Sequence, residues 1–197
     1  MGIKYFILVI GILSCSVLQA QKKGETKFYQ NEKRIIVKKD KVVALKKMPF
    51  AVSFSHKKYN EQTESFYAVQ IAVLKNKSDL EILKVGSHTD EIPFFKSGSG
   101  YAASENLVDD NLYIGNTGHH YLYYTDEKNK RVDLLKNERN DYEGIWHINT
   151  FNDIETSTSA RMSKYKGKEL YFVIFKDENL NQIINEGEFK IYTIKLF

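Results

Sequence analysis

Short apolar stretches separated by polar turns recur along the chain from residue 34 onwards. Several are rich in β-branched and aromatic residues or alternate apolar with polar positions, which is the pattern of β-strands. We expect about ten strands, at 34–45 (a hairpin), 48–54, 65–75, 80–85, 111–116, 119–126, 130–135, 144–151, 169–175 and 188–197. The pattern predicts an all-β fold, a single antiparallel sandwich or barrel-like domain, or an α+β variant with one short helix near 100–108.

The apolar stretches differ in length and in spacing. The longest, at 65–75, has the continuous β-branched and aromatic character of a central strand buried on both faces. The three stretches between 111 and 135 are separated by short turns and predict a meander. A long polar connection at 86–111 precedes them. Because long connections in compact domains commonly carry function, we expect a binding surface there.

The first 20 residues have the organisation of a secretory signal peptide. Lys4 is followed by the apolar run YFILVIGIL, which is too short to span a bilayer. Two processing sites compete: LQA, ending at Ala20, suits signal peptidase, and ILSC, ending at Cys15, resembles a lipobox whose cysteine carries a lipid anchor. Ala20 is slightly favoured. We expect an exported protein that is periplasmic, secreted or anchored to the envelope, with no transmembrane helix in the mature chain.

The sequence divides into a signal peptide at 1–20, a polar basic leader at 21–33 and a single β-rich domain at 34–197. Cys15 is the only cysteine, so a chain cleaved after Ala20 has no disulfide and no thiol nucleophile. The domain must therefore be stabilised by its hydrophobic core.

Positive charge is concentrated near the N-terminus. Residues 22–47 carry ten Lys or Arg and three acids, whereas residues 48–197 have a net charge of −4. The basic segment suits contact with anionic lipid or a cell-wall polymer. The preferred interpretation is a solvated leader followed by an edge hairpin guarded by lysines. Nucleic acid is not an expected partner, because the segment lacks a recognisable module.

Catalytic signatures are scarce. The motifs G-x-S-x-G and H-E-x-x-H are absent, and S-x-x-K occurs twice without a K-T-G partner. The histidines at 119–120 would point to opposite faces of a strand, so they do not predict a shared metal ion. We expect a protein that is not an enzyme. The alternative is a hydrolase with residues scattered in sequence, using a histidine such as His120 or His147.

The segment DENLNQIINEGE at 177–188 has oxygen-bearing residues at the spacing of a calcium loop. The candidate Ca²⁺ ligands, one of them through its backbone carbonyl, are Asp177, Asn179, Asn181, Ile183, Asn185 and Glu188. These twelve residues resemble an EF-hand loop, although Gln182 stands where that loop has glycine and strands are expected on both sides. The alternative is a polar hairpin loop in which Asn and Asp side chains bond to their own backbone.

Aromatic residues cluster around the 86–111 connection and the expected meander. The candidate partner-binding residues are Phe94, Phe95, Tyr101, Tyr121 and Tyr123. Exposed aromatic side chains favour recognition, although β-strands also use them for packing. The sequence predicts an exported, non-enzymatic binding protein of a bacterial-type cell envelope. Its partner would be another envelope or extracellular protein or a surface polymer, and an inhibitor or immunity-like factor is a narrower form. A calcium-binding β domain is the second hypothesis.

Overall fold

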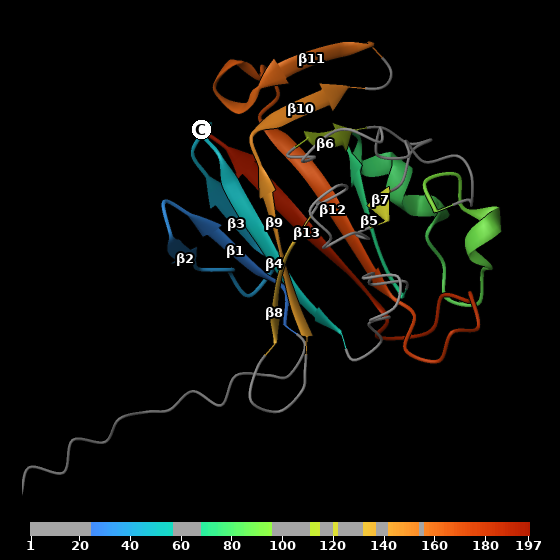
Figure 1. Cartoon of the computed structure of the whole chain (residues 1–197). Helices are drawn as coiled ribbons and strands as arrows, with labels where there is room; N and C mark the ends of the chain where they lie inside the picture. The colour runs from blue at the N-terminus through green and yellow to red at the C-terminus, as the bar shows by residue number, and fades with distance from the viewer. Residues whose placement is uncertain are drawn as a thin grey trace, which may run out of the picture.

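The computed structural model describes residues 25–56, 68–95, 111–114, 120–121, 132–136, 142–153 and 156–197. Within these ranges the chain forms thirteen strands and three short 3₁₀ helices, arranged as the expected all-β sandwich (Figure 1). The expected signal peptide and the short helix near 100–108 lie outside the described residues. In the described part of the chain, no helix is long and apolar enough to cross a membrane.

One five-stranded sheet, here called sheet A, has only antiparallel neighbours. Its order is β2 (Lys33–Ile35), β1 (Lys27–Gln30), β4 (Phe50–His56), β9 (Tyr142–Ile148) and β8 (Asp133–Lys136). β1 and β2 form a hairpin through Asn31 and Glu32, whose φ angles of 51° and 62° suit the twist of a two-residue turn. Residues 27–30, expected in the leader, are therefore part of the fold.

The second five-stranded sheet, sheet B, is built around a long C-terminal hairpin. Its order is β3 (Val42–Leu45), β13 (Phe189–Leu196), β12 (Glu169–Lys176), β5 (Val69–Leu74) and β7 (His120–Tyr121). β3 joins β13 in parallel, with Leu45 opposite Leu196. β5 lies between β12 and β7 and is almost wholly buried, so the central strand expected at 65–75 is confirmed.

A third sheet of three strands lies across one end of the sandwich, at the top of Figure 1. Its order is β11 (Thr158–Arg161), β10 (Thr150–Asp153) and β6 (Asn111–Ile114). β10 follows β9 after a single residue. The stretch expected as one strand at 144–151 therefore contains parts of two strands, which belong to different sheets. The 3₁₀ helices span Lys77–Ile82, Thr89–Glu91 and Met162–Lys164.

The main core lies between sheets A and B. Phe28 and Phe50 of sheet A pack edge-on against Phe172 of sheet B, with ring centroids 6.1 Å apart in both pairs. Trp146 and Ile71 are buried in the same cluster. Each fully buried side chain of this size contributes about 1.5–3 kcal/mol, so this interface holds the two sheets together without a disulfide.

A second, smaller core covers the outer face of sheet B. In β12, Phe172 faces the main core, whereas Val173 and Phe175 belong to the second core. Residues 75–95 and 177–188 fold over these outward side chains and complete this core. Because β12 is covered on both faces, its sequence is apolar at consecutive positions rather than alternating.

Several expected pairings are wrong. Residues 34–45 do not form a hairpin, because β2 pairs with β1 in sheet A and β3 pairs with β13 in sheet B. Within the described parts of residues 111–135, β6, β7 and β8 do not pair with one another as the expected meander requires, because they belong to three different sheets. Residues 80–85 lie in a 3₁₀ helix and its exit rather than in a strand. The sandwich is also not wholly antiparallel, because β3–β13 and β6–β10 are parallel pairs.

Candidate functional site

Residues 75–95 and 177–188 lie side by side over the outer side of sheet B, and together they are called the loop face. Backbone hydrogen bonds join the two segments. The Gly86 N–H donates to the Ile184 carbonyl at 2.8 Å, and the Ile184 N–H donates to the Ser87 carbonyl at 2.9 Å. The second core supports both segments from below. The loop face is therefore one bonded surface rather than two independent loops.

Asp177 closes the first turn of the loop at 177–188. One carboxylate oxygen accepts the Asn181 N–H at 3.2 Å, and the other accepts the Gln182 N–H at 2.9 Å. Leu180 and Gln182 have positive φ angles of 63° and 59°. A left-handed conformation costs a residue with a Cβ about 1–2 kcal/mol. Hydrogen bonds to a charged group, worth about 1.5–3 kcal/mol each, offset this cost.

Glu188 closes the other end of the loop. Its carboxylate accepts the Glu178 N–H at 3.0 Å, the Asn185 N–H at 3.1 Å and the Asn185 side-chain amide at 2.9 Å. The same amide donates to the Ile183 carbonyl at 3.1 Å. Asp177 and Glu188 are both buried, so their charges stabilise the loop from inside. This bonding has the form of the polar hairpin.

The six candidate calcium ligands all lie in this loop. Besides the bonds of its two carboxylates, the side-chain oxygen of Asn179 accepts the Asn181 N–H at 3.1 Å, and that of Asn181 accepts the Ile183 N–H at 2.9 Å. In the part of the chain that the structure describes, no group of three or more His, Cys, Asp or Glu is placed to hold a metal ion. Bound Ca²⁺ stays a prediction.

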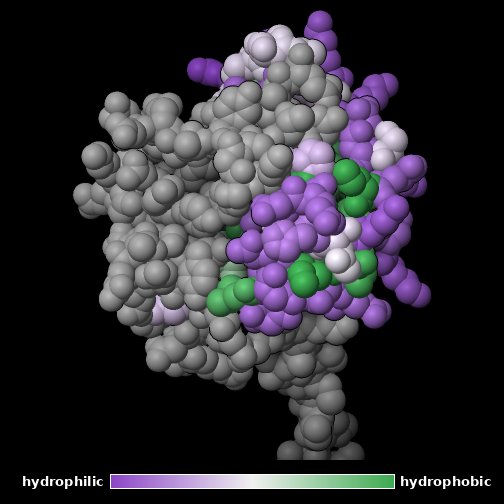
Figure 2. All heavy atoms as spheres, turned by 90° about the vertical axis from the view of Figure 1, so that its right-hand side faces the viewer, coloured by the Kyte–Doolittle hydropathy of each residue, from purple (hydrophilic) through white to green (hydrophobic). Residues whose placement is uncertain are grey.

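Three apolar side chains project from the loop face into solvent. The exposed fractions are 41% for Ile82, 59% for Val85 and 42% for Leu180. Leu80, in the 3₁₀ helix at Lys77–Ile82, and Leu83, just after it, pack on the second core, whereas Ile82 and Val85 are exposed. Figure 2, which faces this side, shows apolar atoms interrupted by polar ones. Reading 80–85 as a strand missed these residues, although the Leu80–Leu83 spacing was a usable signal.

The loop face is acidic. Its two segments contain eight Asp or Glu and three Lys, a net charge of −5. Asp177 and Glu188 are buried, and the other six acids are partly or fully exposed. Lys75 pairs at 3.0 Å with Asp153, which lies outside the loop face. A surface with this net charge attracts basic groups and repels anionic ones.

The predicted aromatic binding residues are not brought together at the surface. Phe94 and Phe95 are both 1% exposed, and Phe95 packs against Phe175 with ring centroids 5.6 Å apart. Their assignment to partner binding is wrong, because their rings are core of the loop face. Tyr121 lies in β7, where only its backbone is described, and Tyr101 and Tyr123 lie outside the described residues.

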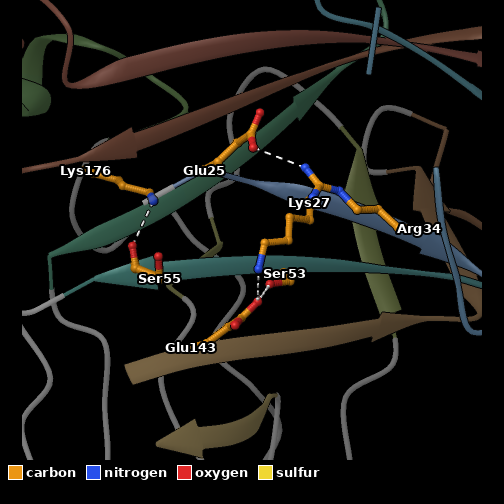
Figure 3. Close-up of polar contacts among 7 residues, drawn as sticks. All are labelled: Glu25, Lys27, Arg34, Ser53, Ser55, Glu143 and Lys176. Carbon is orange, nitrogen blue, oxygen red and sulfur yellow. Dashed lines mark hydrogen bonds and ion pairs between the residues drawn. The ribbon is translucent and has the colours of Figure 1, made fainter. Parts of the chain in front are cut away.

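The outer face of sheet A carries a polar cluster, shown in Figure 3. Glu143 of β9 accepts a hydrogen bond from the Ser53 hydroxyl of β4 and one from Lys27 of β1, the latter at 3.1 Å. On the same sheet, His147 Nε2 lies 2.9 Å from a carboxylate oxygen of Asp133. The serine and the histidine are thus bonded to different acids, whereas a hydrolase pairs its nucleophile with its base. The His120 side chain is not described.

A half-buried lysine lies at the end of β12. Lys176 donates to the Ser55 carbonyl at 2.8 Å (Figure 3). Burial, followed by repulsion from Lys190, lowers the pKa of Lys176 to about 8, although Glu178 opposes the shift. Nearby, Nε2 of the buried His56 lies 3.6 Å from a carboxylate oxygen of Glu178. This lysine differs from the surface lysines because its charge is disfavoured by the fold.

Comparison with known proteins does not identify a family for this chain. No protein-family model matches the chain, and no curated protein matches it significantly. The function therefore has to be argued from the residues themselves.

Proposed function

We propose that the protein is an exported, non-enzymatic binding protein of the cell envelope that recognises another protein through the loop face. The observation that carries this proposal is the exposure of Ile82, Val85 and Leu180 on an otherwise acidic surface. Apolar side chains that form the centre of an interface, with polar residues around them, are typical of protein recognition.

The construction of the loop face supports the proposal. A surface that is already bonded in place loses little conformational entropy when a partner binds. The backbone bonds between Gly86, Ile184 and Ser87 and the buried rings of Phe94 and Phe95 supply such preorganisation. The acidic surroundings favour a partner with a basic contact surface and disfavour an anionic polymer. An inhibitor or immunity-like factor is one form that this role can take.

Export is part of the proposal and rests on the N-terminal sequence. Cleavage after Ala20 leaves a free chain, whereas processing at Cys15 leaves a lipid anchor. The intact mass of the processed protein distinguishes the two outcomes, because only the second carries acyl chains. An unprocessed N-terminus on the protein in cells would contradict export.

Site-specific photo-crosslinking in cells tests the binding role. A photoreactive amino acid is placed at Ile82, Val85 or Leu180, and at Leu135 and Phe197 as exposed apolar controls away from the loop face. We expect one adduct of defined mass at the first three positions and none at the controls. Adducts at all five positions, or at none, would contradict a partner on the loop face.

A second candidate is a calcium-dependent domain in which Ca²⁺ orders the loop at 177–188. It is favoured by the positive φ of Gln182, 59°, because the sixth position of a calcium loop requires that conformation. Asp177 and Glu188, its two charged candidate ligands, both lie buried within this loop.

Thermal unfolding in EDTA and in millimolar Ca²⁺ tests this candidate. At about 100 times its Kd, an ion that binds only the folded state adds about 2.7 kcal/mol, which is several degrees in Tm. We expect the Ca²⁺-induced shift, if calcium is a ligand, to disappear in Asp177→Ala and Glu188→Ala. Identical Tm values with and without Ca²⁺ would exclude it and leave the binding role unaffected.

A further inference from the structure

A second charged region lies on the opposite side of the molecule from the loop face. Residues 25–47, here called the basic edge, comprise β1, β2, β3 and their connections, at the left of Figure 1. β2 and β3 are the outermost strands of sheets A and B on this side. The basic edge carries eight Lys or Arg and three acids, a net charge of +5.

Two of the three acids of the basic edge have contacts within it, whereas most of its lysines pair with no carboxylate of the described residues. Glu25 pairs with Arg34 at 3.1 Å, and Asp40 accepts the Val42 N–H at 3.4 Å in the turn before β3. Lys27 is paired with Glu143. Six lysines have no carboxylate partner among the described residues: Lys33, Lys38, Lys39, Lys41, Lys46 and Lys47. Their positive charge is therefore free to attract an anionic partner.

Protection of the sheet edge does not account for these lysines. Charged side chains guard an edge strand when they lie within it. β3 has the sequence VVAL and carries no charge, and five of the six lysines lie in the connections before and after β3. Only Lys33 is in an edge strand. Most of these lysines thus lie in the connections of the basic edge rather than in β3, the edge strand that would need protection.

A large apolar side chain projects from the same region. Ile36 is 85% exposed, and it lies between Ile35 and Val37, which both pack against the main core. The alternation fixes Ile36 in the outward direction, as on a strand. An isoleucine held out of the protein among unpaired lysines combines the two interactions of an interfacial membrane contact, apolar insertion and attraction to anionic headgroups.

We propose that the basic edge binds the surface of an anionic phospholipid membrane, with Ile36 inserted among the headgroups and the lysines around it. The position of the edge in the chain fits this role. Nine residues separate Cys15 from Glu25, a distance of about 30 Å when extended, so a chain lipidated at Cys15 holds the basic edge within reach of the bilayer. The loop face then points away from the membrane, toward soluble partners.

A polarity-sensitive dye on the processed, exported protein tests the contact. The dye is attached at Ile36→Cys, with Val85→Cys as a matched exposed position on the loop face. Vesicles are made of phosphatidylcholine alone or with about one-third phosphatidylglycerol. We expect the emission at position 36 to report an apolar environment on the anionic vesicles only, and position 85 to stay in water on both. This readout applies with or without an acyl chain.

Lysine variants separate a defined surface from a general charge effect. The double variant Lys38→Ala, Lys39→Ala should lower the equilibrium constant for insertion at position 36 about 25-fold, because each lysine near an anionic surface is worth about a fivefold factor. Lys77→Ala, Lys84→Ala removes two exposed lysines from the loop face and should leave it unchanged.

Three results of the dye experiment would overturn the proposal. They are equal insertion into neutral and anionic vesicles, no insertion into either, or an equal loss in the two double variants. Binding of the basic edge to the acidic loop face of a second copy would give light scattering that grows with protein concentration and no dye response, which also overturns it. All substituted lysines are exposed, so an unchanged Tm verifies that each variant is folded.

Discussion

The basic edge and the loop face have net charges of equal size and opposite sign, but these charges have different relations to the fold. In the loop face, Asp177 and Glu188 accept backbone N–H groups and are buried. On the basic edge, six lysines have no carboxylate partner among the described residues. Folding therefore explains the central acids of the loop face, whereas ion pairing among the described residues does not account for these six lysines.

The largest effect on this comparison should come from the packing beneath the loop face. Phe95→Ala removes a buried ring that contacts Phe94 and Phe175, and we expect a loss of about 3–5 kcal/mol in the free energy of unfolding. Ile36→Ala on the basic edge should change it by less than about 0.5 kcal/mol, because Ile36 is 85% exposed. Urea unfolding measures both. Similar losses would mean that the basic edge is packed as tightly as the loop face.

Lys176 contrasts with the exposed lysines of the basic edge. Its pKa is lowered from 10.5 to about 8 in the folded protein, so the unfolded chain binds more protons between these two values. Stability must then rise with pH across this window, by about 3 kcal/mol in total. The free energy of unfolding of the wild type minus that of Lys176→Met should show this rise. A difference that is flat from pH 7 to 10.5 would show that the charge of Lys176 is not disfavoured.

Substitutions of Glu188 and Glu186 test whether the acids of this loop affect stability through hydrogen bonds or through net charge. Glu188→Ala leaves the N–H groups of Glu178 and Asn185 without their acceptor, and we expect a loss of about 1–3 kcal/mol. Glu186→Ala removes an exposed acid of the same loop and should cost less than about 0.5 kcal/mol. Equal effects in chemical denaturation would show that net charge, rather than loop bonding, decides the stability.

The smallest effect is expected from the surface pair of the basic edge. Arg34 and Glu25 are 3.1 Å apart, with side chains 45% and 41% exposed. Arg34→Ala should lower the free energy of unfolding by no more than about 0.5 kcal/mol, and about 1 M salt should remove the difference. A loss above 1.4 kcal/mol would contradict our view that charge on the basic edge contributes little to folding.

The sequence was most informative where burial is continuous. The apolar runs of β5 and β12 predicted their strands, because a strand covered on both faces has no polar positions to confuse the pattern. β1 was missed because it has four residues and only Phe28 among them enters the main core. Residues 80–85 were misread because the sequence LEILKV fits both alternation and a period of three.

The neighbours of each strand and the geometry of the candidate site were harder to predict from the sequence. Local periodicity reports which positions are buried, but β6, β7 and β8 join three sheets through contacts with distant strands. The same limit applies to Phe94 and Phe95. As aromatic residues they were predicted to form a binding surface, but their rings are buried in the core. The loop at 177–188 was recognised as a bonded unit because its ligand-like spacing is local. The spacing alone does not show whether the side-chain oxygens of this loop bind an ion or backbone N–H groups.

The parallel pairing of β3 with β13 has a consequence for the order of events during synthesis. β3 has β13 as its neighbour in sheet B, and β12, the neighbour of β5, also comes late in the chain. Residues 42–45 therefore leave the ribosome long before residues 189–196 exist to pair with them. Such long-range pairing delays folding until the last strands are available. A nascent chain that stays open for this long is one that a translocation channel can still thread.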